Sequence, residues 1–160
     1  MNRITVIESP YQGTSEQVAA NVRYARACVL DSIRRGEAPF ASHLLYTQPG
    51  VLNDGDVFER RLGIRTGFAF YEAAKVSAVY VDRGLTDGMY RGAYAGHVAG
   101  ACVEVRTLGA HPPITVLATV GCDEKTFRDA LKDAATRLNA GHAIRAEYEA
   151  ERARKADTAT

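Results

Sequence analysis

The 160-residue sequence lacks a strong charge of either sign and a long apolar run. Its 20 basic and 19 acidic side chains almost cancel, so no long-range field draws the protein to nucleic acid or to an anionic membrane surface. Charged residues interrupt every apolar stretch well before the roughly 20 residues that a membrane span needs. We therefore predict neither a nucleic-acid nor a membrane partner, which leaves small neutral or singly anionic ligands.

Cysteine is scarce and unpatterned. Cys28, Cys102 and Cys122 are an odd number, with no CxxC and no Cys/His spacing, so neither a disulfide framework nor a metal site is predicted. The loop over residues 9–13 lacks the glycine triplet that brings a dinucleotide close to a helix, and we predict no cofactor. The apolar run at the N-terminus is too short for a signal peptide, and we expect a cytoplasmic protein.

Apolar runs and helical stripes alternate along the chain. Short apolar runs predict strands at 4–7, 39–45, 76–81, 102–105 and 114–120. Spacings of three and four predict helices between them, over about 14–36, 56–75 and 89–99, and a charged helix from 123 to about 155 with a break or kink at Gly141. Gly92 and Gly96 should let the third helix pack closely. This order predicts an α/β domain over residues 4–122, with a mostly parallel sheet of four or five strands, and a C-terminal helical extension over residues 123–160.

Polar residues follow the first three predicted strands, at the edge of an open parallel sheet where ligands bind. The candidate ligand-binding residues are Ser9, Pro10, Tyr11, Gly13, His43, Asp82, Arg83, Thr86, Asp87, Gly88 and Met89. Backbone N–H groups at the turn over residues 86–88 suit a phosphate or carboxylate. Helix capping by Thr86 or Asp87 explains the same turn without a ligand, and His43 is equally typical of an ordinary loop residue.

Four segments together resemble the nucleoside 2-deoxyribosyltransferase-like superfamily. They are Ile-Glu-Ser-Pro-Tyr-Gln-Gly at 7–13, Asn-Val-Arg-Tyr-Ala at 21–25, Ala-Pro-Phe-Ala-Ser-His-Leu-Leu-Tyr at 38–46, and Gly-Leu-Thr-Asp-Gly-Met at 84–89. The resemblance covers roughly residues 4–106 and is nearest to a small branch found in bacteriophage and actinobacterial genomes. It implies a flavodoxin-like three-layer sandwich, with a nucleoside or nucleotide bound at the strand ends.

The resembling enzymes cleave or transfer N-glycosidic bonds with a glutamate nucleophile on the helix after the third strand, four residues beyond a glycine. Counting from Gly88 places Gly92 at that position, and no carboxylate lies between Gly88 and Val103. Either the acid comes from another loop, with Asp82, Asp87 and Glu8 as candidates, or the site binds without reacting. Asp82 and Asp87 are the catalytic residues that we predict.

Three functions follow from these observations. The sequence favours a protein that binds a nucleoside or nucleotide without the covalent glutamate mechanism. The alternative is an N-glycosidic hydrolase or transferase with a relocated acid, and the third possibility is a structural or protein-interaction module. More aromatic residues than a small core needs also predict a homo-oligomer with an exposed aromatic interface, drawn from Phe68, Phe70, Tyr71, Tyr90 and Tyr94.

Overall fold

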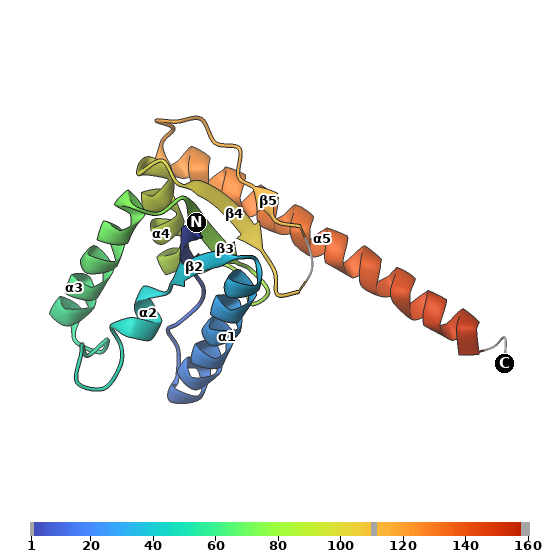
Figure 1. The fold of residues 1–160 in the computed structure, drawn as a ribbon, viewed down its shortest axis with the longest axis horizontal. Coiled ribbons are helices and arrows are strands. Elements are labelled where there is room, and N and C mark those ends of the chain that lie inside the picture. Colours follow the sequence, from blue (N-terminus) through green and yellow to red (C-terminus); the bar gives the residue numbers. More distant parts are fainter. Residues whose placement is uncertain (1, 110–111, 158–160) are drawn as a thin grey trace.

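The computed structural model describes residues 2–109 and 112–157 and contains one five-stranded sheet. Its elements are β1 (Arg3–Glu8), α1 (Ser15–Arg34), β2 (Glu37–Phe40), α2 (Ser42–Leu45), α3 (Val57–Phe68), η1 (Ala69–Glu72), β3 (Val76–Tyr80), α4 (Asp87–Val98), β4 (Cys102–Arg106), β5 (Ile114–Thr115) and α5 (Glu124–Asp157) (Figure 1). The strand order is β2-β1-β3-β4-β5, with β1 to β4 parallel and β5 antiparallel to β4. This confirms the predicted flavodoxin-like α/β fold with its C-terminal helix.

Helices cover both faces of the sheet, which explains why its central strand is apolar throughout. All five residues of β3 are buried, as expected for a parallel strand with no solvent face. On one face, α1 packs Tyr24 and Cys28 against the sheet. On the other face, α4 and α5 pack their buried side chains against the opposite set of strand residues, and the members of this core are Met89, Tyr90, Ala93, Phe127, Leu131, Val79, Val103 and Val105.

Three predicted elements differ from the structure. The strand expected over 39–45 ends at Phe40. The backbone N–H groups of Leu44 and Leu45 donate hydrogen bonds to the carbonyl of Ala41, and α2 begins there. The helix expected to reach residue 75 gives way to the 3-10 turn η1 after Phe68. The strand expected over 114–120 is reduced to two residues.

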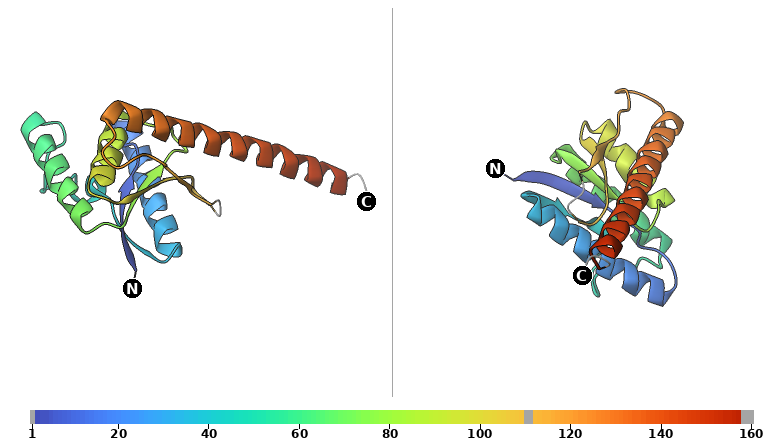
Figure 2. Two further views of the ribbon diagram at one scale, coloured as in Figure 1. Left: turned by 90° about the horizontal axis from the view of Figure 1, so that it is seen from above. Right: turned by 90° about the vertical axis from the view of Figure 1, so that its right-hand side faces the viewer.

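The break predicted at Gly141 is also wrong, since α5 runs through it without interruption. One glycine costs a helix about 1 kcal/mol relative to alanine, which the neighbouring helix-forming residues offset. The first half of α5 is held to the domain by a buried stripe that includes Phe127, Leu131 and Leu138. Its second half extends well past the edge of the sheet (Figure 2). Within the described residues, no helix combines the length and apolarity that crossing a membrane requires.

Several exposed apolar side chains lie on α3, at the opposite end of the molecule from the tip of α5 (Figure 1), and others, such as Leu117 and Val120, lie elsewhere. Phe58 is 80% exposed, and Val57 and Leu62 are also exposed. The predicted aromatic interface is wrong in two of its members, because Tyr71 and Tyr90 are buried in the core. Oligomerisation itself stays a prediction.

A buried ion network crosses the face of the sheet that α1 covers. The guanidinium of Arg106 is fully buried and donates to both oxygens of Glu37, at 2.7 and 2.8 Å, and to Glu104 at 2.6 Å. Arg3 and Ser32 also donate to Glu37, at 2.8 and 2.6 Å. Burial alone would raise the pKa of Glu37, but the hydrogen bonds from Arg106 and Ser32 dominate and lower it to about 2. The network therefore joins β2 to β4 in the ionised state.

Replacing Arg106 tests how far the sheet depends on this network. Arg106→Met leaves Glu37 buried without its bidentate partner and should reduce the free energy of unfolding by about 3–5 kcal/mol, measured by urea denaturation. Arg128→Met, which breaks an exposed ion pair with Asp87, serves as the control and should change stability little. Equal losses of stability in Arg106→Met and Arg128→Met would contradict this account.

The lowered pKa of Glu37 predicts a pH effect as well. Because this pKa is lowered from 4.5, wild-type stability should fall as the pH drops from about 4.5 to 2.

Candidate functional site

A cavity of about 130 Å³ lies at the carboxyl ends of the strands. Its wall comes from the end of β1 and the loop that follows, from α2, α3 and η1, and from the first turns of α4. β1 lies between β2 and β3, so the chain leaves it on one face of the sheet through α1 and leaves β3 on the other face through α4. Such a point, where the strand order reverses, is where open α/β sheets bind ligands.

Six of the eleven predicted binding residues line this cavity. They are Ser9, Tyr11, His43, Thr86, Gly88 and Met89. Ser9 Oγ and His43 Nε2 share a hydrogen bond of 2.9 Å, and the Tyr11 ring lies 5.8 Å from the His43 ring between centroids. Burial lowers the pKa of His43 to about 4, so at neutral pH its uncharged ring has one donor and one acceptor nitrogen. The cavity therefore brings together side chains from the first two strand ends, as predicted.

The carboxyl group in the cavity wall belongs to Glu8, the last residue of β1. The Tyr71 hydroxyl donates a hydrogen bond to Glu8 Oε1. A Cβ atom at Gly92 would lie within 2.5 Å of Glu8 Oε2 and still closer to Oε1. The carboxyl thus occupies the space that a side chain on α4 would otherwise fill, and only glycine fits opposite it.

Gly96 lies one turn beyond Gly92 and has the same role for Tyr71. A Cβ there would lie 2.8 Å from Tyr71 Cε1 and 2.9 Å from Ser77 Cβ. Two glycines on one face of α4 therefore leave room for the hydrogen-bonded Glu8–Tyr71 pair between the helix and the sheet. The close packing predicted from these glycines is confirmed.

The surroundings of Glu8 favour its neutral form. Burial raises the pKa of Glu8 from 4.5 to about 8, although the hydrogen bond from Tyr71 acts in the opposite direction. Burial and the neighbouring Glu8 also raise the pKa of Tyr71 well above its usual value, so its hydroxyl stays a donor. Because Tyr71 donates to Oε1, the acidic proton of Glu8 is best placed on Oε2. A carboxylic acid that is neutral at pH 7 can donate this proton.

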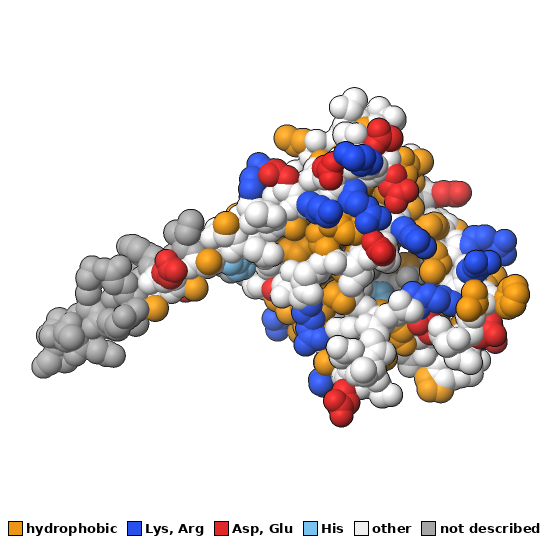
Figure 3. Space-filling model, turned by 180° about the vertical axis from the view of Figure 1, so that it is seen from behind, with side chains coloured by type: hydrophobic (Ala, Val, Ile, Leu, Met, Phe, Trp, Pro, Cys, Tyr) orange, Lys and Arg blue, Asp and Glu red, His pale blue; other side chains and the backbone are white. Residues whose placement is uncertain are grey.

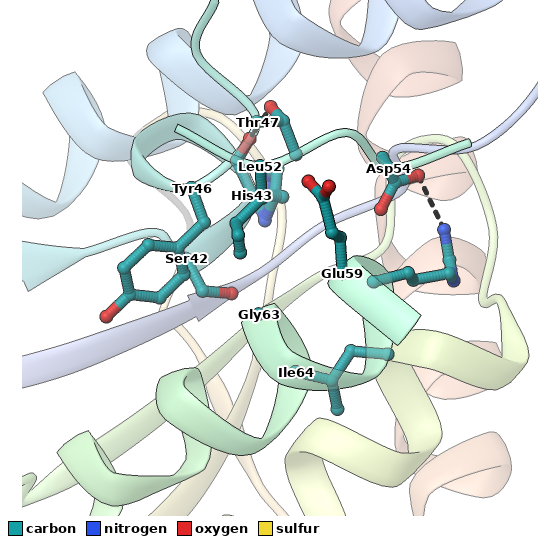
Figure 4. Close-up of a pocket in the computed structure, with 10 residues that line it drawn as sticks. Ser42, His43, Tyr46, Thr47, Leu52, Asp54, Glu59, Gly63 and Ile64 are labelled. Atoms are coloured by element: carbon teal, nitrogen blue, oxygen red, sulfur yellow. Dashed lines mark hydrogen bonds and ion pairs between the residues drawn. The ribbon is translucent and has the colours of Figure 1, made fainter. Parts of the chain in front are cut away.

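A second, smaller cavity of about 60 Å³ adjoins the first and shares Ser42, His43 and Ile64 with it. Figure 4 shows it between α2, α3 and the loop that joins them, with the ion pair between Asp54 and Arg60, 2.6 Å long, at one side. Its wall includes the aromatic ring of Tyr46. His43 therefore lies at the junction of two cavities.

The predicted catalytic residues Asp82 and Asp87 lie outside the cavity wall. Asp82 accepts hydrogen bonds from the Tyr24 hydroxyl at 2.6 Å and from the backbone N–H of Leu108 at 3.1 Å. Asp87 is exposed and pairs with Arg128 of α5 at 2.8 Å. The catalytic roles of both aspartates stay predictions, and their observed contacts tie loops and helices together.

Three other predicted residues shape the loop after β1 or lie within it. Arg83 donates to Asn21 Oδ1 at 2.9 Å, and Asn21 in turn donates to the carbonyl of Tyr11 at 3.0 Å. Gly13 adjoins the capping box of α1, where a Cβ would overlap the side chain of Gln17. Pro10 precedes Tyr11 and is buried outside the cavity wall. Arg83 therefore supports the position of Tyr11 through Asn21, and none of the three residues lines the cavity.

Basic side chains gather on the face of the molecule that α4 and α5 cover (Figure 3). Among them, Arg91 of α4 reaches the cavity wall. Arg128 and Lys132 of α5 lie over the Tyr90 ring, at 4.4 and 5.9 Å from its centroid. Among the described residues no group of three or more His, Cys, Asp or Glu side chains could hold a metal ion. Arg128 is paired with Asp87, so Arg91 is the basic side chain that suits an anionic group on a ligand.

The fold is that of a flavodoxin-like α/β protein, with a cavity at the strand ends. Residues 3–106 match the family model described as Domain of unknown function (DUF7768), and the chain belongs to this family. No curated protein matches the sequence. A solved structure described as a 2-deoxyribosyltransferase from the psychrotolerant bacterium Bacillus psychrosaccharolyticus is similar, with 15% identity and a TM-score of 0.47, over 68% of this chain and 75% of that one.

The contact between Glu8 and Gly92 can be tested by stability. Gly92→Ala should reduce the free energy of unfolding by about 1–3 kcal/mol, since the new methyl group overlaps the carboxyl. Gly88→Ala is the matched control on α4, because a Cβ there is 3.8 Å from its nearest neighbour, Thr86 Oγ1. Combining Gly92→Ala with Glu8→Ala should recover part of the loss. Additive losses in a double-mutant cycle of urea unfolding would show that the two positions do not compete for space.

The raised pKa of Glu8 predicts a second effect, on the pH dependence of stability. The folded pKa lies above the ordinary value, so the stability that the neutral carboxyl contributes is complete below about pH 4.5 and is lost as the pH rises to about 8. Glu8→Gln removes this titration. The melting temperature of the variant, relative to wild type, should therefore increase between pH 5 and pH 8. A constant difference over that range would contradict the assignment.

Proposed function

We propose that the strand-end cavity binds a nucleoside or a nucleotide-derived ligand. The observation that carries the proposal is the meeting of three polar or aromatic groups in one cavity: the Ser9–His43 pair, the Tyr11 ring and the Glu8–Tyr71 pair. The segments that supply Glu8, Ser9, Tyr11 and His43 are also those whose sequence resembles the nucleoside 2-deoxyribosyltransferase-like superfamily.

The chemistry of the wall supports a ligand with uncharged polar edges and an aromatic face. Neutral His43 and the neutral carboxyl of Glu8 each combine a donor with an acceptor, which suits sugar hydroxyls and the edge of a base. Tyr11 and Phe68 present aromatic rings to the same cavity, and aromatic rings stack on bases. Arg91 is the cationic residue of the wall and suits a phosphate.

A thermal-shift screen tests this proposal. The probes are purine and pyrimidine 2′-deoxyribonucleosides, ribonucleosides and their 5′-monophosphates, and at least one should raise the melting temperature of the wild-type protein. His43→Ala should abolish that rise. His97→Ala is the matched control, since His97 contacts Phe127 and Cys122 away from the cavity, and it should keep the rise. A panel in which no probe stabilises the protein would instead favour a structural or protein-interaction module.

A second function is favoured by one specific observation. After Asp87 in its first turn, α4 has no carboxylate, yet the carboxyl of Glu8 lies against Gly92. A relocated acid of this kind is what the N-glycosidic hydrolase or transferase alternative requires.

A further inference from the structure

We infer that Glu8 is the proton donor for hydrolysis of an N-glycosidic bond in this cavity, with water as the nucleophile and no covalent intermediate. The inference rests on the proposed nucleoside-type ligand and adds a catalytic residue and a reaction to it. It assigns the chemistry to the end of β1 rather than to α4.

The placement of Glu8 is the first support. Of the described residues that line the cavity, Glu8 alone carries a carboxyl group. The missing side chain of Gly92 leaves that carboxyl against the backbone of α4, and the Tyr71 hydroxyl fixes one of its two oxygens. The other oxygen, Oε2, is left to meet a ligand.

The charge of Glu8 decides between an acid and a nucleophile. A carboxyl group must be ionised to attack a sugar carbon, and no cationic side chain contacts Glu8 in the described structure to favour that form. Its hydrogen-bond partner is a neutral tyrosine, and burial raises its pKa to about 8. The group is thus mainly protonated at neutral pH, which is the state that a general acid needs.

The proposed reaction is a direct hydrolysis at the sugar C1′. Glu8 transfers its proton to a ring nitrogen of the base while the bond from that base to the sugar C1′ breaks, and the bonding electron pair leaves with the base. Water adds to the resulting sugar cation at C1′, and the proton that this water loses returns to the Glu8 carboxylate. One water is consumed, and the products are the free base and a sugar with a hydroxyl at C1′. During the step, the ionised Glu8 also stabilises the positive charge on the sugar.

Base release from the same probes tests this role. Wild-type protein should liberate free base, detected by chromatography, from at least one 2′-deoxyribonucleoside or 5′-monophosphate that raises its melting temperature. Glu8→Gln keeps the size of the side chain but removes the acid, and should lower the rate about 100-fold or more while the ligand-induced rise in melting temperature is kept. Glu72→Gln is the matched control, because Glu72 is an exposed acid on η1 beside Tyr71, and should have wild-type activity.

The pH profile separates proton donation from a structural role. Wild-type kcat/KM should fall as the pH rises through about 8, where Glu8 loses its proton. Tyr71 acts as a positioning residue, and its hydrogen bond lowers the pKa of Glu8. Tyr71→Phe should therefore move the basic limb of the profile to higher pH. A merely structural effect of Tyr71→Phe would lower the rate without moving the limb.

Adding a second free base to the reaction shows whether Glu8 acts as a general acid or as a nucleophile. Without a covalent sugar intermediate, adenine added to a reaction that releases another base should yield no new nucleoside. Formation of the exchanged nucleoside, or wild-type rates in Glu8→Gln, would overturn the inference. Probes that stabilise the wild-type protein without any base release would also overturn it, while leaving the proposed binding function intact. Failure of every probe to stabilise the protein would count against the binding function itself.

Discussion

The site depends on one steric constraint, which is the close approach of α4 to the end of β1. Gly92 and Gly96 lie one turn apart on α4, and each lacks the Cβ that would collide with Glu8 or with Tyr71. These two side chains hydrogen-bond to each other in the space so left. A larger residue at either glycine would push α4 away from the sheet or expel the carboxyl. The same closeness that separates Glu8 from bulk water therefore also raises its pKa.

The two faces of the sheet hold glutamates in opposite states of charge. Glu37, on the face that α1 covers, meets the guanidinium of Arg106 and stays ionised, with a pKa of about 2. Glu8, on the face that α4 covers, meets the neutral Tyr71 hydroxyl and has a pKa of about 8. Both are desolvated, so the difference lies in the partner. Arg106 thus makes Glu37 a structural link between strands, whereas among the described residues no cationic side chain contacts Glu8, which stays an acid.

The local pattern of the sequence was enough to predict the order of strands and helices and the placing of Ser9, Tyr11 and His43 around one cavity. It was not enough to choose among the three candidate acids, because that choice depends on partners distant in sequence. Asp82 meets Tyr24 and Asp87 meets Arg128, whereas Glu8 meets Tyr71, which is 63 positions away. Tyr71 itself lies on a short 3-10 turn with no motif around it. The sequence therefore indicated only that it is aromatic, which predicted a place in an exposed interface rather than a contact with Glu8.

The charges around the cavity also bear on how a ligand would lie in it. With a pKa of about 4 for His43 and about 8 for Glu8, both groups are neutral through the physiological range, since a base protonates below its pKa and an acid ionises above it. Among the described residues of the wall, Arg91 is then the charged side chain. An anionic group is drawn toward Arg91, since the nearby Arg128 of α5 is already paired with Asp87. The uncharged part of the same molecule is left to face Glu8 and His43, where hydrogen bonds rather than ion pairs select it.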